Sequence, residues 1–67
     1  MDNLTALFRD MRQKLNDLRL ELTFGNTAKI VLLRGDKKIF TVTAASINAC
    51  TDIAFSKLMD YKKTVLP

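Results

Sequence analysis

Cysteine and histidine, the side chains best suited to nucleophilic and acid–base chemistry at neutral pH, are almost missing from this chain of 67 residues. Cys50 is the single cysteine, and there is no histidine. The usual general base near pH 7 is therefore absent. One cysteine without histidine also cannot supply the ligands of a structural zinc site. The sequence predicts a protein without catalytic residues, metal ligands or a cofactor.

The remaining reactive side chains have ordinary structural interpretations. Cys50 falls on the apolar stripe of an expected helix and has no basic neighbour in sequence to activate it, which favours a buried core cysteine over a nucleophile. Asp10 and Asp17 are seven residues apart, and a solvated pair is favoured over an acid/base couple. Gly25 and Gly35 stand alone, so the sequence has no glycine-rich loop that could hold phosphate.

Basic residues concentrate in the middle of the chain. The whole sequence carries 11 basic and 7 acidic side chains, a net charge of +4. Residues 25–44 contain Lys29, Arg34, Lys37 and Lys38 against the single acidic residue Asp36. A positive charge of this size suits nucleic acid or an acidic protein surface, and is as often a matter of solubility.

Hydrophobic periodicity predicts the elements that must position these residues. Apolar residues recur every three or four positions over residues 2–17, which predicts a helix. Strict alternation follows over residues 18–24 and favours a half-buried strand, although a helix continued to residue 23 is the rival interpretation. Ser46 is the expected N-cap of a last helix that ends by about residue 63.

Two glycine-first pairs, Gly25-Asn26 and Gly35-Asp36, are typical of tight two-residue hairpin turns in which the first residue has positive φ, so positive φ is expected at both glycines. They predict strands at residues 18–24, 27–34 and 37–44. The expected fold is a single α+β domain spanning residues 1–67. In it a helix, a three-stranded antiparallel meander and a second helix follow one another, with both helices on one face of the sheet.

The expected turns fix a register in which Phe24 faces Thr27 and Arg34 faces Lys37. Counting from these pairs gives one face of mainly apolar residues, on which Lys29 lies between Leu22 and Val42 as an unfavourable exception. The face that should cover the core contains Leu18, Leu20, Leu22, Phe24, Val31, Leu33, Phe40, Val42 and Ala44, with Thr27, Lys29 and Lys38 as its polar members. The face that should point away from the helices contains Arg19, Glu21, Thr23, Ala28, Ile30, Leu32, Arg34, Lys37, Ile39, Thr41 and Thr43.

An apolar patch on the outward face is the expected site of partner contact. An apolar centre with a polar rim is the usual composition of a protein interface, although β-branched residues are also common on ordinary strand surfaces. The predicted interface consists of Ile30, Leu32 and Ile39 at its centre with Arg19, Arg34 and Lys37 around it.

Binding of double-stranded nucleic acid through the second hairpin is the alternative. The element order is similar to that of the double-stranded RNA-binding domain, whose second helix begins with a lysine-rich cluster that grips phosphates. This chain has no Lys or Arg between Ile39 and Phe55, so the element order is shared and the phosphate contacts at that helix are not. The expected nucleic-acid contacts are Arg19, Arg34, Lys37 and Lys38.

The sequence thus favours a small accessory or regulatory protein that acts by protein–protein contact. So short a chain buries only about 60% of its unfolded surface, and self-association would add stability, so a homodimer is expected. The partner is a second copy, another protein or nucleic acid, and no small-molecule substrate is inferred. No apolar run reaches the roughly 18 residues of a membrane span, and a reducing cytoplasm is the expected location.

Overall fold

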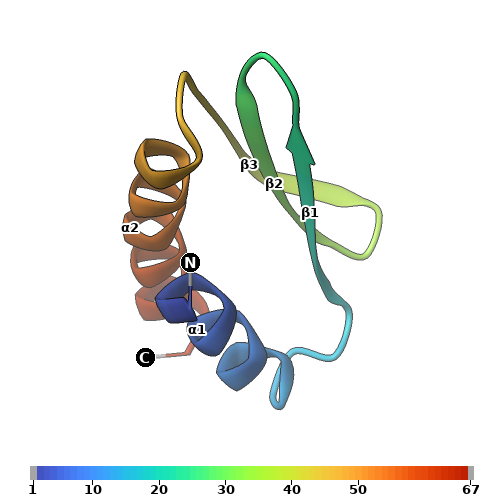
Figure 1. The fold of residues 1–67 in the computed structure, drawn as a ribbon. Coiled ribbons are helices and arrows are strands. Elements are labelled where there is room, and N and C mark those ends of the chain that lie inside the picture. The colour runs from blue at the N-terminus through green and yellow to red at the C-terminus, as the bar shows by residue number, and fades with distance from the viewer. Residues whose placement is uncertain (1, 67) are drawn as a thin grey trace.

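The computed structural model describes residues 2–66 and confirms a small α+β fold in which helix, antiparallel meander and helix follow one another (Figure 1). Its three strands form one sheet in the order β1-β2-β3, so β1 and β3 are the edge strands. Both helices lie on the same side of the sheet in Figure 1. The elements are α1 (Asp2–Arg12), β1 (Leu18–Phe24), β2 (Ala28–Arg34), β3 (Lys37–Ala44) and α2 (Ile47–Val65).

Helix α1 is shorter than its apolar period predicts. It ends at Arg12 because the backbone N–H groups of Lys14 and Leu15 both donate to Met11 O, at 3.1 and 2.9 Å, and the chain then turns towards β1. Leu15 still packs in the core. The apolar period therefore continued through a turn beyond the helix. Residues 18–24 form a strand, as the alternating pattern predicts, and not an extension of the helix.

The first hairpin has one more loop residue than its sequence predicts. Phe24 lies opposite Ala28 and not opposite Thr27, so the loop contains three residues, Gly25 to Thr27. Gly25 N donates to Thr27 O at 3.1 Å. Positive φ occurs among the described residues at Gly35 alone, with φ of 62°, so the expectation of a positive φ at Gly25 is wrong.

The second hairpin has the predicted turn, followed by an irregularity in β3. Arg34 lies opposite Lys37, as expected for the two-residue loop Gly35-Asp36. The register then shifts, because Leu33 pairs with Lys38 while Leu32 pairs with Phe40. Ile39 is thus an extra residue in β3, which makes a β-bulge.

These two features exchange the predicted faces of β2. Because side chains alternate along a strand, a shift of one residue moves every side chain of β2 to the opposite face. Ile30 lies between Leu22 and Val42, where the predicted register put Lys29. Lys29 therefore does not lie on the core face. The central strand presents Ala28, Ile30 and Leu32 to the helices.

Helix α2 completes the core. Ser46 caps it as predicted, since its hydroxyl oxygen accepts a hydrogen bond from Ala49 N at 3.1 Å. The helix runs to Val65, two residues past its expected end. Lys62 Nζ on α2 lies 3.4 Å from Asp10 Oδ2 on α1 and links the two helices. The buried core consists of Leu4, Met11, Leu15, Leu18, Ala28, Ile30, Leu32, Val42, Cys50, Ala54 and Leu58.

Candidate protein interface

The interface patch that the sequence predicts does not exist at its expected place. Ile30 and Leu32 are both 0% exposed and belong to the core beneath the helices, so their placement on the outward face is wrong. The physical reason is the shift of β2 by one residue. Ile39, the bulged residue, is half-buried and packs against the same core.

The basic residues around the predicted patch are divided between the two faces of the sheet. Arg19 lies opposite Leu33 on the face without helices, where its Nε is 3.5 Å from Glu21 Oε2. Lys38 also lies opposite Leu33 and shares that face, so its expected place on the core-covering face is wrong, because the bulge at Ile39 shifts the register of β3. Lys37 lies opposite Arg34, whose side chain is turned towards the helices. The four basic residues expected to contact nucleic acid therefore do not form one surface.

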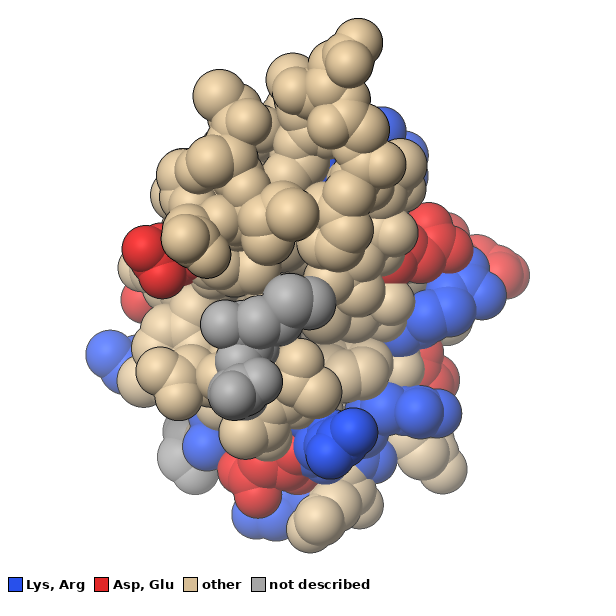
Figure 2. Space-filling view, in the orientation of Figure 1, with Lys and Arg blue, Asp and Glu red and all other residues tan. Residues whose placement is uncertain are grey.

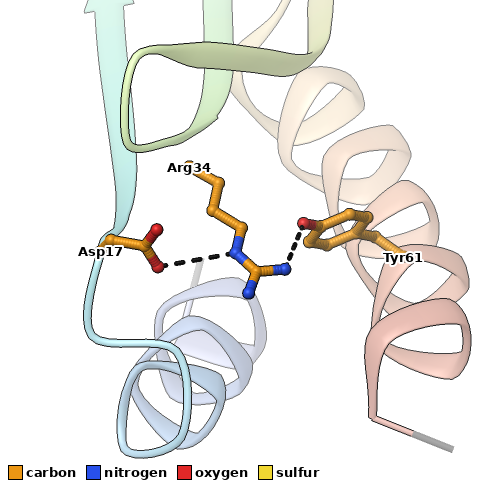
Figure 3. Close-up of polar contacts among 3 residues, drawn as sticks. All are labelled: Asp17, Arg34 and Tyr61. Carbon is orange, nitrogen blue, oxygen red and sulfur yellow. Dashed lines mark hydrogen bonds and ion pairs between the residues drawn. The ribbon is translucent and has the colours of Figure 1, made fainter.

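Arg34 joins three parts of the chain (Figure 3). Its Nε lies 3.5 Å from Asp17 Oδ1, in the turn before β1, and its Nη1 donates to the Tyr61 hydroxyl of α2 at 3.5 Å. The hydrogen bond to Tyr61 and the negative charge of Asp17 raise the pKa of the Arg34 guanidinium above its ordinary value. Arg34 therefore has a structural role in joining these three parts. The sequence predicts it only at the rim of an interface or in contact with a phosphate.

The side chains considered for catalysis are held in structural contacts. Cys50 is buried as predicted, and its single thiol proton is shared between two carbonyl oxygens, Ala28 O at 3.5 Å and Val42 O at 3.6 Å from Sγ. Burial raises the pKa of this thiol. Asp10 and Asp17 belong to separate ion pairs, with Lys62 and with Arg34. Among residues 2–66 no three His, Cys, Asp or Glu side chains are close enough together to hold a metal ion.

The face of the sheet without helices offers little exposed apolar surface. Its central strand presents Val31 and Leu33, which are only 6% and 9% exposed. Glu21 and Thr41 lie directly beside Val31, and Arg19 and Lys38 flank Leu33 in the same way. Polar and charged side chains thus flank both apolar residues, which leaves little hydrophobic area there for a partner to bury.

Exposed apolar surface is found instead on the face that carries the helices. Leu22 and Phe24 of β1 are 38% and 44% exposed, and Ile47 at the start of α2 is 47% exposed. In Figure 2 charged side chains lie along the lower part and on both margins, while the upper part over the β1–β2 hairpin and the start of α2 is nearly free of charge. The helices cover β2 and leave the C-terminal half of β1, which contains Leu22 and Phe24, exposed.

We call the exposed residues Leu22 and Phe24 the apolar strip. A groove between α1 and β1 continues this apolar strip. It has a volume of about 490 Å³ and an apolar floor of Phe8, Leu20 and Leu22. Polar and basic side chains of α1 and of the turn after it form the rim, namely Thr5, Arg9, Arg12, Gln13 and Asn16. A second hollow of about 500 Å³ shares part of this lining and extends past Arg19 of β1 to Asp36 in the turn between β2 and β3. We call the groove and the free edge of β1 beside it the β1 surface.

The two edges of the sheet differ in how they are protected against pairing with another strand. Bulges and lysines on an edge strand discourage such pairing. Edge strand β3 has both, the bulge at Ile39 and the exposed residues Lys37 and Lys38. Edge strand β1 pairs regularly with β2 over all seven residues and contains neither lysine nor proline. Its free edge is the one open to a further strand.

Comparisons with known proteins give no functional assignment. The chain has no match among protein-family models, curated proteins or solved structures. None of the helices within residues 2–66 is long and apolar enough to cross a membrane. Inference about function therefore rests on the β1 surface itself.

Proposed function

We propose that this chain is a non-enzymatic accessory or regulatory module that acts by protein–protein contact through the β1 surface. One observation carries the proposal, which is that Leu22 and Phe24 stay exposed on the core-facing side of an unprotected edge strand. An apolar floor with a polar rim is the usual composition of a protein interface. A small domain with limited burial also gains stability when a partner covers such a surface.

A cytoplasmic location is part of the proposal. The single cysteine, Cys50, lies in the core, where it packs as a small apolar residue beside Ala28 and Val42. A chain of this size that is stabilised by an apolar core and a partner, without a disulfide, suits a reducing compartment.

Two exposed apolar residues allow a matched test. Leu22 lies on the β1 surface, whereas Ile53 lies on α2 and is exposed to a similar degree. Extended peptides selected from a displayed library for binding to the parent should bind Leu22→Lys at least about tenfold more weakly, a loss of 1.4 kcal/mol. The same peptides should bind Ile53→Lys like the parent. Circular dichroism checks that both variants fold.

Peptide ligands that bind Leu22→Lys as tightly as the parent would show that the contact surface lies elsewhere. Duplex RNA and duplex DNA are added in a parallel sedimentation measurement at two salt concentrations. A complex that forms with either duplex and weakens steeply with salt would favour nucleic-acid binding over protein contact.

A further inference from the structure

The backbone groups on the free edge of β1 can be identified from two hydrogen bonds. Gly35 N donates to Asp17 O at 3.0 Å and Gly25 N donates to Thr27 O at 3.1 Å. These bonds flank the pairs Leu18/Arg34 and Phe24/Ala28, which makes both of them non-hydrogen-bonded pairs of the antiparallel ladder. Hydrogen-bonded and non-hydrogen-bonded pairs alternate along such a ladder.

The alternation divides β1 into two sets of residues. The backbone groups that bond to β2 belong to Arg19, Glu21 and Thr23. The N–H and C=O groups of Leu20, Leu22 and Phe24 point to the free edge. Leu18 offers only its C=O there, because Leu18 N already donates to Leu15 O at 3.1 Å. The residues that offer free hydrogen-bonding groups are therefore those whose side chains lie on the same face as the groove.

We propose that the partner strand is β1 of a second copy of this chain, paired antiparallel with Leu20 on the two-fold axis. This inference rests on the proposed protein-contact function and names its partner. In this arrangement each Leu20 lies opposite the other and each Leu18 lies opposite the second copy's Leu22. The Leu20 pair exchanges both N–H···O bonds. Each Leu18/Leu22 pair makes one bond, from Leu22 N–H to Leu18 O, because Leu18 N–H is bonded to Leu15 O. These bonds join two three-stranded sheets into one continuous sheet.

Charge complementarity selects both the second copy and the register. With Leu20 on the axis, Arg19 of each copy lies opposite Glu21 of the other, in a non-hydrogen-bonded pair in which side chains approach most closely. Arg19 and Glu21 already form an ion pair 3.5 Å long within β1, and both are well exposed. Pairing of two copies brings the two ion pairs together as an alternating set of four charges.

Neighbouring registers are less favourable. An axis at Leu18 would place Arg19 opposite Asp17, but Asp17 precedes β1 and already pairs with Arg34, and Leu18 N–H is bonded to Leu15 O. An axis at Arg19 places two arginines opposite each other, and an axis at Glu21 places two glutamates opposite each other. Like charges directly opposite destabilise a strand pair. An axis at Leu22 places Glu21 opposite Thr23 and leaves Arg19 opposite Gly25. The pattern Arg-Leu-Glu centred on Leu20 is the part of the free edge that is complementary to itself.

The paired arrangement also covers the exposed apolar strip. Leu20 and Leu22 of the second copy join Leu18, Leu20 and Leu22 of the first on the face that contains the groove. Side chains exposed in the single chain thus gain apolar neighbours.

Reversal of the two charges tests the register. Sedimentation equilibrium should show that Arg19→Glu and Glu21→Arg each raise the dissociation constant of the dimer about tenfold, because two attractive pairs become repulsive. The double variant with both changes should return to within about threefold of the parent. Lys57→Glu on α2 alters the net charge as Arg19→Glu does and should leave self-association unchanged. If the double variant associates as weakly as either single one, the register is wrong.

Cysteine cross-linking provides a second test that does not depend on charge. Opposed hydrogen-bonded residues have Cα atoms about 5.5 Å apart, within the range that a disulfide spans. Leu20→Cys should therefore oxidise to a covalent dimer, while Leu22→Cys, which would face Leu18, should do so at least about tenfold more slowly. The native Cys50 is buried, so the parent protein is the control that should form no covalent dimer. Faster cross-linking of Leu22→Cys would overturn the proposed axis.

Failure of this inference can be separated from failure of the proposed function. A folded parent that stays monomeric at millimolar concentration overturns the second copy as partner. If Leu22→Lys still weakens peptide binding in that case, protein contact through the β1 surface stands with a different partner. If neither effect is seen, both proposals fall.

Discussion

Ile30 of β2 and Leu22 of β1 lie directly opposite each other on one face of the sheet, yet only Ile30 is buried. The side chain of Ile30 lies in the core beneath the helices, while that of Leu22 is 38% exposed. The boundary between the covered and the bare part of this face therefore falls between neighbouring strands. The apolar strip beyond that boundary is the basis of the proposed contact surface.

Core and strip should respond differently to the loss of side-chain volume. Leu32→Ala removes buried methyl groups from the centre of the core and should lower the free energy of unfolding by about 2–5 kcal/mol. Leu22→Ala should cost less than about 1 kcal/mol, because much of this side chain is already in water. Urea denaturation at low protein concentration measures both values. Equal losses would contradict the assignment of the two positions.

The two hairpin glycines should not be equivalent. Gly35 has φ of 62°, so Gly35→Ala should cost about 1–2 kcal/mol through backbone strain, and no clash is involved because the nearest atom to an added Cβ is 3.8 Å away. Gly25 lacks positive φ and has open space around it, so Gly25→Ala should be neutral or slightly stabilising. Thermal melting compares the two variants. A larger loss at Gly25 would contradict the three-residue loop.

Cys50 should react slowly with thiol reagents in the native protein. Its side chain is 0% exposed and burial raises the pKa of the thiol, so both access and thiolate formation are restricted. Labelling with an excess of a chromogenic disulfide should become fast only in urea, where the chain unfolds. Rapid labelling without urea would reopen the possibility of a nucleophilic cysteine.

The same thiol makes stability depend on alkaline pH. The pKa of Cys50 is higher in the folded chain than in the unfolded chain, so its contribution is complete below the unfolded value. As the pH rises above that value, about 8.5, the unfolded state loses its proton first and the free energy of unfolding falls. Parent protein should thus lose more stability than Cys50→Ala between pH 8 and pH 10, as measured by urea denaturation. Parallel pH profiles would contradict this expectation.

The order and approximate bounds of the elements follow from local sequence, while the faces of the sheet do not. Alternation, helical spacing and Ser46 predict the strands and the start of α2 because each depends on nearby residues. The faces of β2 depend on two single-residue features, Thr27 in the first loop and the bulge at Ile39. The one sequence signal for that error was Lys29 on the expected core face, which a shift of one residue removes.

The β1 surface could not be predicted from the sequence for a related reason. Alternation places Leu20, Leu22 and Phe24 on the core-facing side, but how far the helices extend over each strand is a tertiary property. Helix α1 ends at Arg12 and leaves the C-terminal half of β1, with Leu22 and Phe24, uncovered (Figure 1). Of the predicted interface residues, Arg19 is the one that returns in the proposed contact, with Glu21 as its complement.

Amide hydrogen exchange of β1, followed by NMR over a range of protein concentrations, tests the central claim most directly. The N–H groups of Leu20 and Leu22 point to the free edge, whereas that of Glu21 bonds to β2. We predict that protection of Leu20 and Leu22 rises with protein concentration by at least about tenfold, while that of Glu21 changes less. Exchange at Leu20 and Leu22 that stays fast and independent of concentration would contradict pairing of β1 with a second copy.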